Sequence, residues 1–295
     1  MTRRHLAPSP WISLAPALLV IGLLFGTSVI YGLAQSLGVL TGTGQQTLSL
    51  AAYQNVLSGQ GPAGREFWPS LKFSLWIAGA STLLSAFGAL PVAIWLNGRR
   101  GRGSRMDTLA LNWNLAFPHI VWAIGLLLFA SQSGLLARIA ASLGIIQTPG
   151  EFPVVVRDPL GIGIIVDYVT KEIPFLALIV LAVLRSQAEN YEVVAENLGA
   201  TRWQRLRLVT LPQVLPSLTA GSLLVFAFVF SAYEVPAILG VRYPRMLPVL
   251  ALDFFANPDL NNRAEGMAIS FIIAATVLFA AAISLRNENK AGKPQ

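Results

Sequence analysis

The sequence predicts an all-α protein that crosses a lipid membrane with about six transmembrane helices. Three observations lead to this fold class. Hydrophobic residues make up 54% of the 295-residue chain and charged residues only 12%, whereas a soluble domain carries roughly 25% charged residues. The hydrophobic residues form long stretches that reach the length of a membrane span. The charges gather between these stretches, and arginine and lysine favour one side of the predicted membrane.

Six stretches are long and apolar enough to span, since a transmembrane helix needs about 20 mostly apolar residues. They are residues 14–37, 68–96, 109–131, 161–184, 213–240 and 267–285. The first could belong to a signal peptide, because Arg3 and Arg4 precede it. It is long for the apolar part of such a peptide, and no small-x-small cleavage site follows. We therefore expect an uncleaved helix.

The distribution of basic residues predicts that both termini are cytoplasmic. With the N-terminus inside, thirteen arginines and lysines lie on the cytoplasmic side: Arg3, Arg4, Arg99, Arg100, Arg102, Arg105, Arg185, Arg202, Arg205, Arg207, Arg286, Lys290 and Lys293. Six lie on the outer side: Arg65, Arg138, Arg157, Arg242, Arg245 and Arg263. The net charge of +7 could also indicate nucleic-acid binding, but the charges form no continuous basic face. They favour an anionic membrane surface instead.

The spans divide the chain into three parts. Residues 1–66 comprise a cytoplasmic tail, the first transmembrane helix and an outer loop. Residues 67–285 form a core of five transmembrane helices that includes the cytoplasmic loop 189–212. Residues 286–295 are a polar cytoplasmic tail. The second outer loop contains an apolar stretch, 135–146, which is too short to span and should lie at the interface or against the bundle.

Several classes of site are excluded or disfavoured by the sequence. Residues 59–64 read GQGPAG and match a dinucleotide fingerprint, but the proline inside it and its outer-loop position argue against a nucleotide site. No GxxxxGK[ST] motif occurs, so another chain must bind ATP if ATP drives the protein. The chain has no cysteine, and its two histidines, His5 and His119, are far apart. We therefore expect no cofactor and no metal in this chain.

Charged residues inside the fourth and fifth spans are the candidates for a solute path. Asp167 and Lys171 are four residues apart and can pair on one helix face, whereas Glu172 needs another partner. A charge at mid-bilayer costs about 2.5–3.5 kcal/mol, so these groups must pair, face the bundle interior or lie near the outer end. Tyr233 and Glu234 in the fifth span are further candidates. A structural ion pair with interfacial carboxylates and a polar solute path both remain open.

The cytoplasmic loop between the fourth and fifth spans has helical periodicity. Residues 191–198 contain good helix formers, and Gly199 is placed to end that helix. Thr201 and Gln204 then match a capping box, which predicts that a second helix begins at once. Pro212 stands where the fifth span begins. The pattern predicts a helix–turn–helix at the membrane surface, where it could lie on lipid headgroups or be covered by a partner.

These residues resemble the signature of permease subunits of binding-protein-dependent ABC importers. The signature is E-A-A, three residues, Gly, nine residues, an aliphatic residue, any residue and Leu-Pro. Gly199, Val209 and Leu211-Pro212 fit its spacing, whereas Val193-Val194-Ala195 stands for the acidic triplet with Glu192 adjacent. LSLAAYQNVL, FWPSLKFSLWIAGASTLL, YVTKEIPF and EVPAILG look like the same family, so the resemblance covers residues 48 to 285.

The resemblance implies a type I ABC importer transmembrane fold and a coupling role for the loop. The loop would dock on a separate ATPase subunit, which would hold ATP and magnesium. Its expected coupling residues are Glu192, Ala195, Leu198, Gly199, Ala200, Thr201, Arg202, Trp203, Arg205, Leu206, Leu211 and Pro212. The further partners implied are a second permease chain, identical or homologous, and a periplasmic or lipid-anchored solute-binding protein in a bacterial inner membrane.

The solute and two rival classes stay open at this point. The pattern most resembles the branch that moves polyamines, ferric iron and thiamine. The acids Asp167, Glu172 and Glu234 would suit a cationic solute. One rival is an ion-gradient-driven secondary transporter, which would need no ATPase. The other is a membrane enzyme or scaffold, although no nucleophile–base or metal constellation supports an enzyme.

Overall fold

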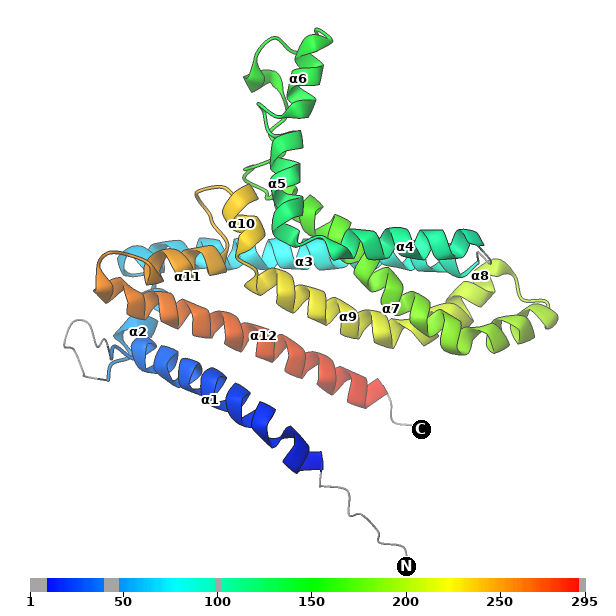
Figure 1. Ribbon diagram of the computed structural model, residues 1–295, viewed down its shortest axis with the longest axis horizontal. Coiled ribbons are helices and arrows are strands. Elements are labelled where there is room, and N and C mark those ends of the chain that lie inside the picture. Colours follow the sequence, from blue (N-terminus) through cyan, green and yellow to red (C-terminus); the bar gives the residue numbers. More distant parts are fainter. Residues whose placement is uncertain (1–9, 40–47, 99–101, 292–295) are drawn as a thin grey trace, which may run out of the picture. The chain divides into compact units, whose positions relative to one another are not determined.

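The computed structural model describes residues 10–39, 48–98 and 102–291, and all regular structure within them is helical (Figure 1). This confirms the predicted all-α fold. The basic residues Arg3, Arg4, Arg99, Arg100 and Lys293 of the predicted topology lie outside the described residues. The first helices are α1 (Pro10–Ser36), α2 (Ala51–Ser58), α3 (Gly61–Asn97), α4 (Arg102–Ala116), α5 (His119–Ala130), α6 (Leu135–Ser142) and the short η1 (Pro149–Glu151). They are followed by α7 (Ile162–Asn197), α8 (Arg202–Arg205), η2 (Leu206–Thr210), α9 (Leu211–Ser231), α10 (Glu234–Leu239), α11 (Leu247–Phe255), η3 (Leu260–Asn262) and α12 (Arg263–Ala291).

Among the described residues, five helical segments are long and apolar enough to cross a membrane. They are Leu14–Ser36, Gly61–Asn97, His119–Ser142, Arg202–Ser231 and Leu260–Ser284. The 36-residue α7 is not among them, although its length suffices, because Asp167, Lys171 and Glu172 interrupt its apolar sequence. These five segments agree with the predicted helical membrane protein, and α7 corresponds to the predicted fourth span.

Three predicted spans differ from the observed helices. The span 109–131 is not one helix: α4 ends at Ala116 and α5 begins at His119, because Pro118 has no amide hydrogen and disfavours helix in the residue before it. The span 213–240 ends early at Ser231, and the extended Ala232 separates it from α10. The span 161–184 continues instead to Asn197, so the predicted membrane helix and the first helix of the predicted cytoplasmic loop are one element.

The chain forms two compact units, and the smaller one comprises residues 1–65 and 251–271. Its core contains Ala52, Ala264 and Ala268, with Tyr53 packed against them. The Tyr53 hydroxyl lies 2.9 Å from Ser36 Oγ, and Asn55 Nδ2 donates to Glu265 Oε1 at 3.1 Å. These contacts join α2 to α1 and to the start of α12.

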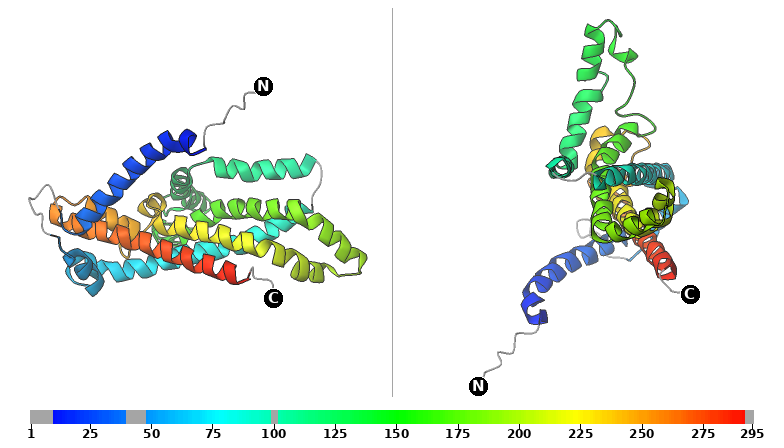
Figure 2. Two further views of the ribbon diagram at one scale, coloured as in Figure 1. Left: turned by 90° about the horizontal axis from the view of Figure 1, so that it is seen from below. Right: turned by 90° about the vertical axis from the view of Figure 1, so that its right-hand side faces the viewer.

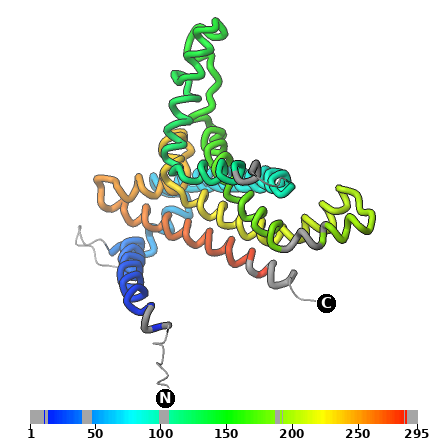
Figure 3. The backbone as a smooth tube through the Cα atoms, turned by 45° about the vertical axis from the view of Figure 1, so that its right-hand side comes forward, coloured from blue at the N-terminus to red at the C-terminus, as the bar shows by residue number. Residues whose placement is uncertain are grey.

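The larger unit, residues 66–250 and 272–295, holds every candidate functional residue. Its central element is α7, which contacts α4, α5, α9, η2 and α10. Close packing depends on glycines in the neighbouring helices, since a Cβ at Gly88 of α3 would lie 2.6 Å from Ile173 and one at Gly221 of α9 would lie 2.9 Å from Leu176. Figure 3 and the right-hand view of Figure 2 show that α6 and the end of α5 next to it project away from α7 and α9 within this unit.

Candidate functional site

The turn of the predicted cytoplasmic loop begins where α7 ends, at Leu198. Gly199 has φ +80°, a left-handed conformation that residues with a Cβ adopt at a cost of about 1–2 kcal/mol. The Gly199 amide donates to Glu196 O at 2.9 Å and the Ala200 amide donates to Ala195 O at 3.0 Å. These bonds satisfy carbonyl groups that a helix end leaves free. The turn therefore has the geometry that the sequence predicts.

The second helix of the turn starts with the predicted capping box. The Thr201 hydroxyl accepts the Gln204 amide at 3.3 Å, and the Gln204 side chain accepts the Thr201 amide at 2.8 Å. The single turn of α8 runs through the π-helical η2 into α9, where Pro212 stands in the first turn. The turn is thus the point at which two membrane helices, α7 and α9, are joined.

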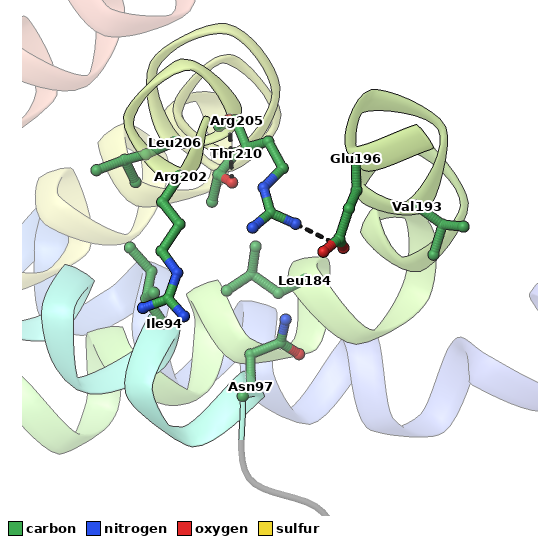
Figure 4. A pocket seen from close by; sticks show the side chains of 10 residues that line it. Ile94, Asn97, Leu184, Val193, Glu196, Arg202, Arg205, Leu206 and Thr210 are labelled. Carbon is green, nitrogen blue, oxygen red and sulfur yellow. Dashed lines mark hydrogen bonds and ion pairs between the residues drawn. The ribbon is translucent and has the colours of Figure 1, made fainter. Parts of the chain in front are cut away.

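A cavity of about 670 Å³ lies behind the turn, between α7, α8, η2 and the end of α3. Figure 4 shows Arg205 directed at Glu196 across the cavity and Arg202 directed at Ile94 and Asn97. Arg205 Nη1 lies 2.7 Å from Glu196 Oε2, with side-chain exposures of 20% and 66%. Arg205, one of the expected coupling residues, is thus joined to the other arm of the turn.

The apolar tip of the turn faces outward. Leu198 is 82% exposed and Trp203 67% exposed, whereas Leu206 is half-buried and lines the cavity. Leu198 and Trp203 therefore form the apolar tip. Val193, at the position of the signature acid, is 55% exposed. The adjacent Glu192 is described only in its backbone.

The second group of predicted site residues lies inside the larger unit, on α7. Lys171 is 1% exposed, and its Nζ donates to the carbonyl oxygens of Asn114 at 2.6 Å and Phe117 at 2.5 Å. Of the alternatives left open, the ion pair of Asp167 with Lys171 is not formed, because the ammonium group is bound by the Asn114 and Phe117 carbonyls. Asp167 is fully buried, and neither carboxylate oxygen has a hydrogen-bond partner among the described residues.

Glu172 finds its partner on α5. His119 Nε2 lies 3.1 Å from Glu172 Oε1, and the His119 ring packs on Phe228 with centroids 4.8 Å apart. A further bond runs from Trp122 Nε1 to Thr170 Oγ1 at 2.7 Å. Neither Trp122 nor Thr170 was among the residues that the sequence predicts for a site. In the sequence, Pro118 is the residue that indicates the helix break, and this break brings the start of α5 beside α7.

The cluster borders a cavity of about 290 Å³ between α4, α5, α7 and α9. Its lining consists of Leu115, His119, Lys171, Glu172, Phe175, Leu224, Val225 and Phe228. Tyr233 and Glu234 are exposed at the start of α10 and do not line this cavity. The described residues hold no group of three or more metal-ligating side chains. The wall of this cavity is mostly apolar and aromatic, with Lys171 and Glu172 nearly buried in it.

A polytopic helical membrane protein with a helix–turn–helix between two of its membrane helices is the class that this geometry defines. Residues 89–287 match the family described as binding-protein-dependent transport system inner membrane component. The match covers more than half of the chain, so the chain belongs to this family of ABC permeases.

Individual relatives agree with this family. The chain is 30% identical over 208 residues to the inner membrane ABC transporter permease protein YnjC of Escherichia coli, which covers 70% of this chain and 39% of YnjC. It is 32% identical over 161 residues to the molybdenum transport system permease protein ModB of Mycobacterium tuberculosis, covering 54% of this chain and 56% of ModB. The chain thus spans about 39% of YnjC and 56% of ModB in length.

The fold matches a solved transporter along almost the whole chain. A chain of a bacterial ABC transporter involved in the import of the acidic polysaccharide alginate superposes with a TM-score of 0.69 and 17% identity. The match covers 94% of this chain and 98% of that one. A second structure shows the alginate transporter in complex with a periplasmic protein, with a TM-score of 0.67 and 18% identity over 94% of this chain and 97% of that one. The type I importer transmembrane fold is therefore confirmed.

Proposed function

We propose that this chain is the transmembrane subunit of an ATP-driven importer, that it forms half of a solute pathway and that loop 189–212 couples it to a separate ATPase subunit. One observation carries the proposal. The exposed tip formed by Leu198 and Trp203 lies on a rigid turn whose two arms continue directly into α7 and α9. A partner that moves the tip would therefore move both membrane helices.

The tip has the composition of a docking surface. Exposed aromatic and aliphatic side chains such as Trp203 and Leu198 gain free energy when a partner pocket buries them. Arg202 and Arg207 are also exposed beside the tip, and they would favour an acidic rim on the partner. Because the sequence contains no phosphate-binding GxxxxGK[ST] loop, ATP and magnesium would be held by that partner. This chain itself would catalyse no reaction.

Two further partners complete the proposed importer. A pathway between two such helical units requires a second permease chain, either a copy or a homologue. The fold shared with the alginate transporter, which has been seen with a periplasmic protein, supports a solute-binding protein on the outer side. We place the assembly in a bacterial inner membrane with both termini cytoplasmic, because the basic residues favour that side.

A small cation, such as a polyamine, ferric iron or a thiamine-like compound, is the solute that the acids support best. Asp167 is buried without a hydrogen-bond partner among the described residues, and Glu172 lines the inner cavity. Glu234 is exposed at the start of α10, with Tyr233 beside it. A cation would compensate the buried carboxylate of Asp167, which has no hydrogen-bond partner among the described residues, and would add to the contact of Glu172 with His119.

Reconstitution tests the proposal. The chain is co-expressed with candidate permease, ATPase and binding-protein subunits of the proposed importer and purified through a tag on this chain alone. We expect an ATPase to co-purify and uptake into proteoliposomes to require ATP and to be stopped by vanadate. Uptake that is driven by an ion gradient, that needs no ATPase and that resists vanadate would contradict the proposal and favour a secondary transporter.

A further inference from the structure

The break between α4 and α5 exposes main-chain carbonyl groups inside the membrane domain. In a continuous helix the Asn114 carbonyl would accept the amide hydrogen of residue 118, but Pro118 has none. The last carbonyls of α4 also lack helical partners. In a membrane such groups must be satisfied by protein, because lipid offers no hydrogen bonds.

Lys171 supplies the missing donors from a different helix. Its ammonium group donates to Asn114 O at 2.6 Å and to Phe117 O at 2.5 Å, and the side chain is 1% exposed. An ammonium group has three donors and no acceptor, which suits two adjacent free carbonyls. The buried ammonium group is thereby in direct contact with carbonyl dipoles at a helix C-terminus and not with a carboxylate.

The residues on either side of Lys171 bind α5. Thr170 Oγ1 accepts Trp122 Nε1 at 2.7 Å, and Glu172 Oε1 lies 3.1 Å from His119 Nε2. Three consecutive residues of α7 thus hold the end of α4 and the first turn of α5.

We propose that Lys171 is a positioning residue that fixes the α4–α5 break to α7, so that the cytoplasmic turn and the wall of the inner cavity move as one body. The inference rests on the proposed function, because the turn moves only if a partner drives it. It assigns Lys171 to coupling and not to contact with the solute.

A single helix, α7, connects Lys171 to the turn at Gly199. The helix runs unbroken from Ile162 to Asn197, so Lys171 lies about 39 Å along the helix from the cytoplasmic turn at a rise of 1.5 Å per residue. Leu115 and His119, which flank the α4–α5 break, belong to the cavity lining. Leu224 and Phe228 of α9 belong to it as well. A displacement of α7 relative to α9 would carry the first pair of lining residues with it and change their spacing from the second.

Spin labels can test whether Lys171 holds α5 to α7, since the chain contains no native cysteine. Cysteines replace Leu128 on α5 and Ala182 on α7, both exposed, in the full chain in lipid nanodiscs. We expect one narrow distance distribution for the otherwise unchanged chain and a clearly broader or shifted one for Lys171→Met. Lys72→Met is the matched control, because Lys72 is an exposed lysine of α3, and it should leave the distribution unchanged.

A distribution in Lys171→Met as narrow as that of the parent, at the same distance, would overturn the inference. If Lys171→Met does not accumulate in the membrane, Pro118→Ala is added, since it restores the amide hydrogen that the Asn114 carbonyl lacks. The double variant should then regain yield, and no gain in yield would equally contradict the assignment.

Nucleotide-dependent distances separate this inference from the proposed function. In the assembled complex, ATP with vanadate should change the distance from Leu128 to a label at Leu215, an exposed residue of α9, and leave the distance from Leu128 to Ala182 unchanged. In Lys171→Met the second distance should change as well. If no distance responds to nucleotide, the proposed function fails, whereas an unperturbed Lys171→Met distribution removes only the role of Lys171.

Discussion

At the scale of single residues, a charged side chain of the turn contacts the other arm of the turn itself. Arg205 lies 2.7 Å from Glu196, so one of the arginines expected to meet a partner instead joins the two arms of the turn. The pair is partly exposed, and such pairs contribute only about 0–1 kcal/mol to stability. Its effect should therefore appear in coupling and hardly in folding.

Charge reversal tests this pair. We expect Arg205→Glu to reduce ATP-driven uptake by roughly fivefold or more, at the low end of coupling free energies between two sites, because two carboxylates would then face each other. The double variant Glu196→Arg with Arg205→Glu should recover most of the uptake at unchanged membrane yield. An equal loss in the single and double variants would show that Arg205 acts through a partner and not through Glu196.

Asp167 is the residue on which the proposed cationic solute depends most. Asp167→Asn removes the charge and keeps the shape, and a carboxylate in the bilayer centre costs about 2.5–3.5 kcal/mol. We therefore expect membrane yield to stay the same or rise, while uptake of the transported cation falls.

Glu234 allows a matched comparison, because it is exposed at the start of α10. Glu234→Gln should leave the yield unchanged and lower uptake of the same cation. Uptake of every candidate cation at the parent rate in both variants would remove these acids from the solute path.

Among the elements, the turn at Gly199 sets the angle between the arms. A β-branched residue at φ +80° is strained by about 1–2 kcal/mol or more, whereas asparagine tolerates this region. We expect Gly199→Val to insert normally and to lose most ATP-driven uptake, with Gly199→Asn between it and the parent. Uptake of Gly199→Val at the parent rate would show that the conformation of the turn is not needed for coupling.

The same elements show how far the sequence predicts the structure. The sequence predicts the turn well, because Gly199, Thr201 and Gln204 determine it through backbone conformation and hydrogen bonds between residues close in sequence. Pro118 also acts locally, yet the span 109–131 was expected to be continuous. Hydrophobic periodicity alone did not reveal the break.

Contacts between distant segments could not be inferred from local patterns. Asp167 and Lys171 have the spacing of an ion pair, but the carbonyls that bind Lys171 lie more than fifty positions away on α4. The helix break and the lysine are complementary only after α4 and α7 pack together. The same holds for the contact of Glu172 with His119.

At the scale of the whole molecule, the central claim is that the tip formed by Leu198 and Trp203 is the place where an ATPase docks. The absence of native cysteine allows a single cysteine to be placed at will. A cysteine at Trp203 is the probe, and a cysteine at Leu143, which is 68% exposed in the predicted outer loop after α6, is the control.

The most direct measurement is site-specific cross-linking in membranes that contain the complete proposed transporter. Trp203→Cys should cross-link to an ATPase subunit, with a yield that changes when ATP and vanadate are added, and Leu143→Cys should not cross-link to it. Trp203→Cys that forms no ATPase adduct, in an assembly that retains ATP-driven uptake, would contradict the assignment of this turn as the coupling site.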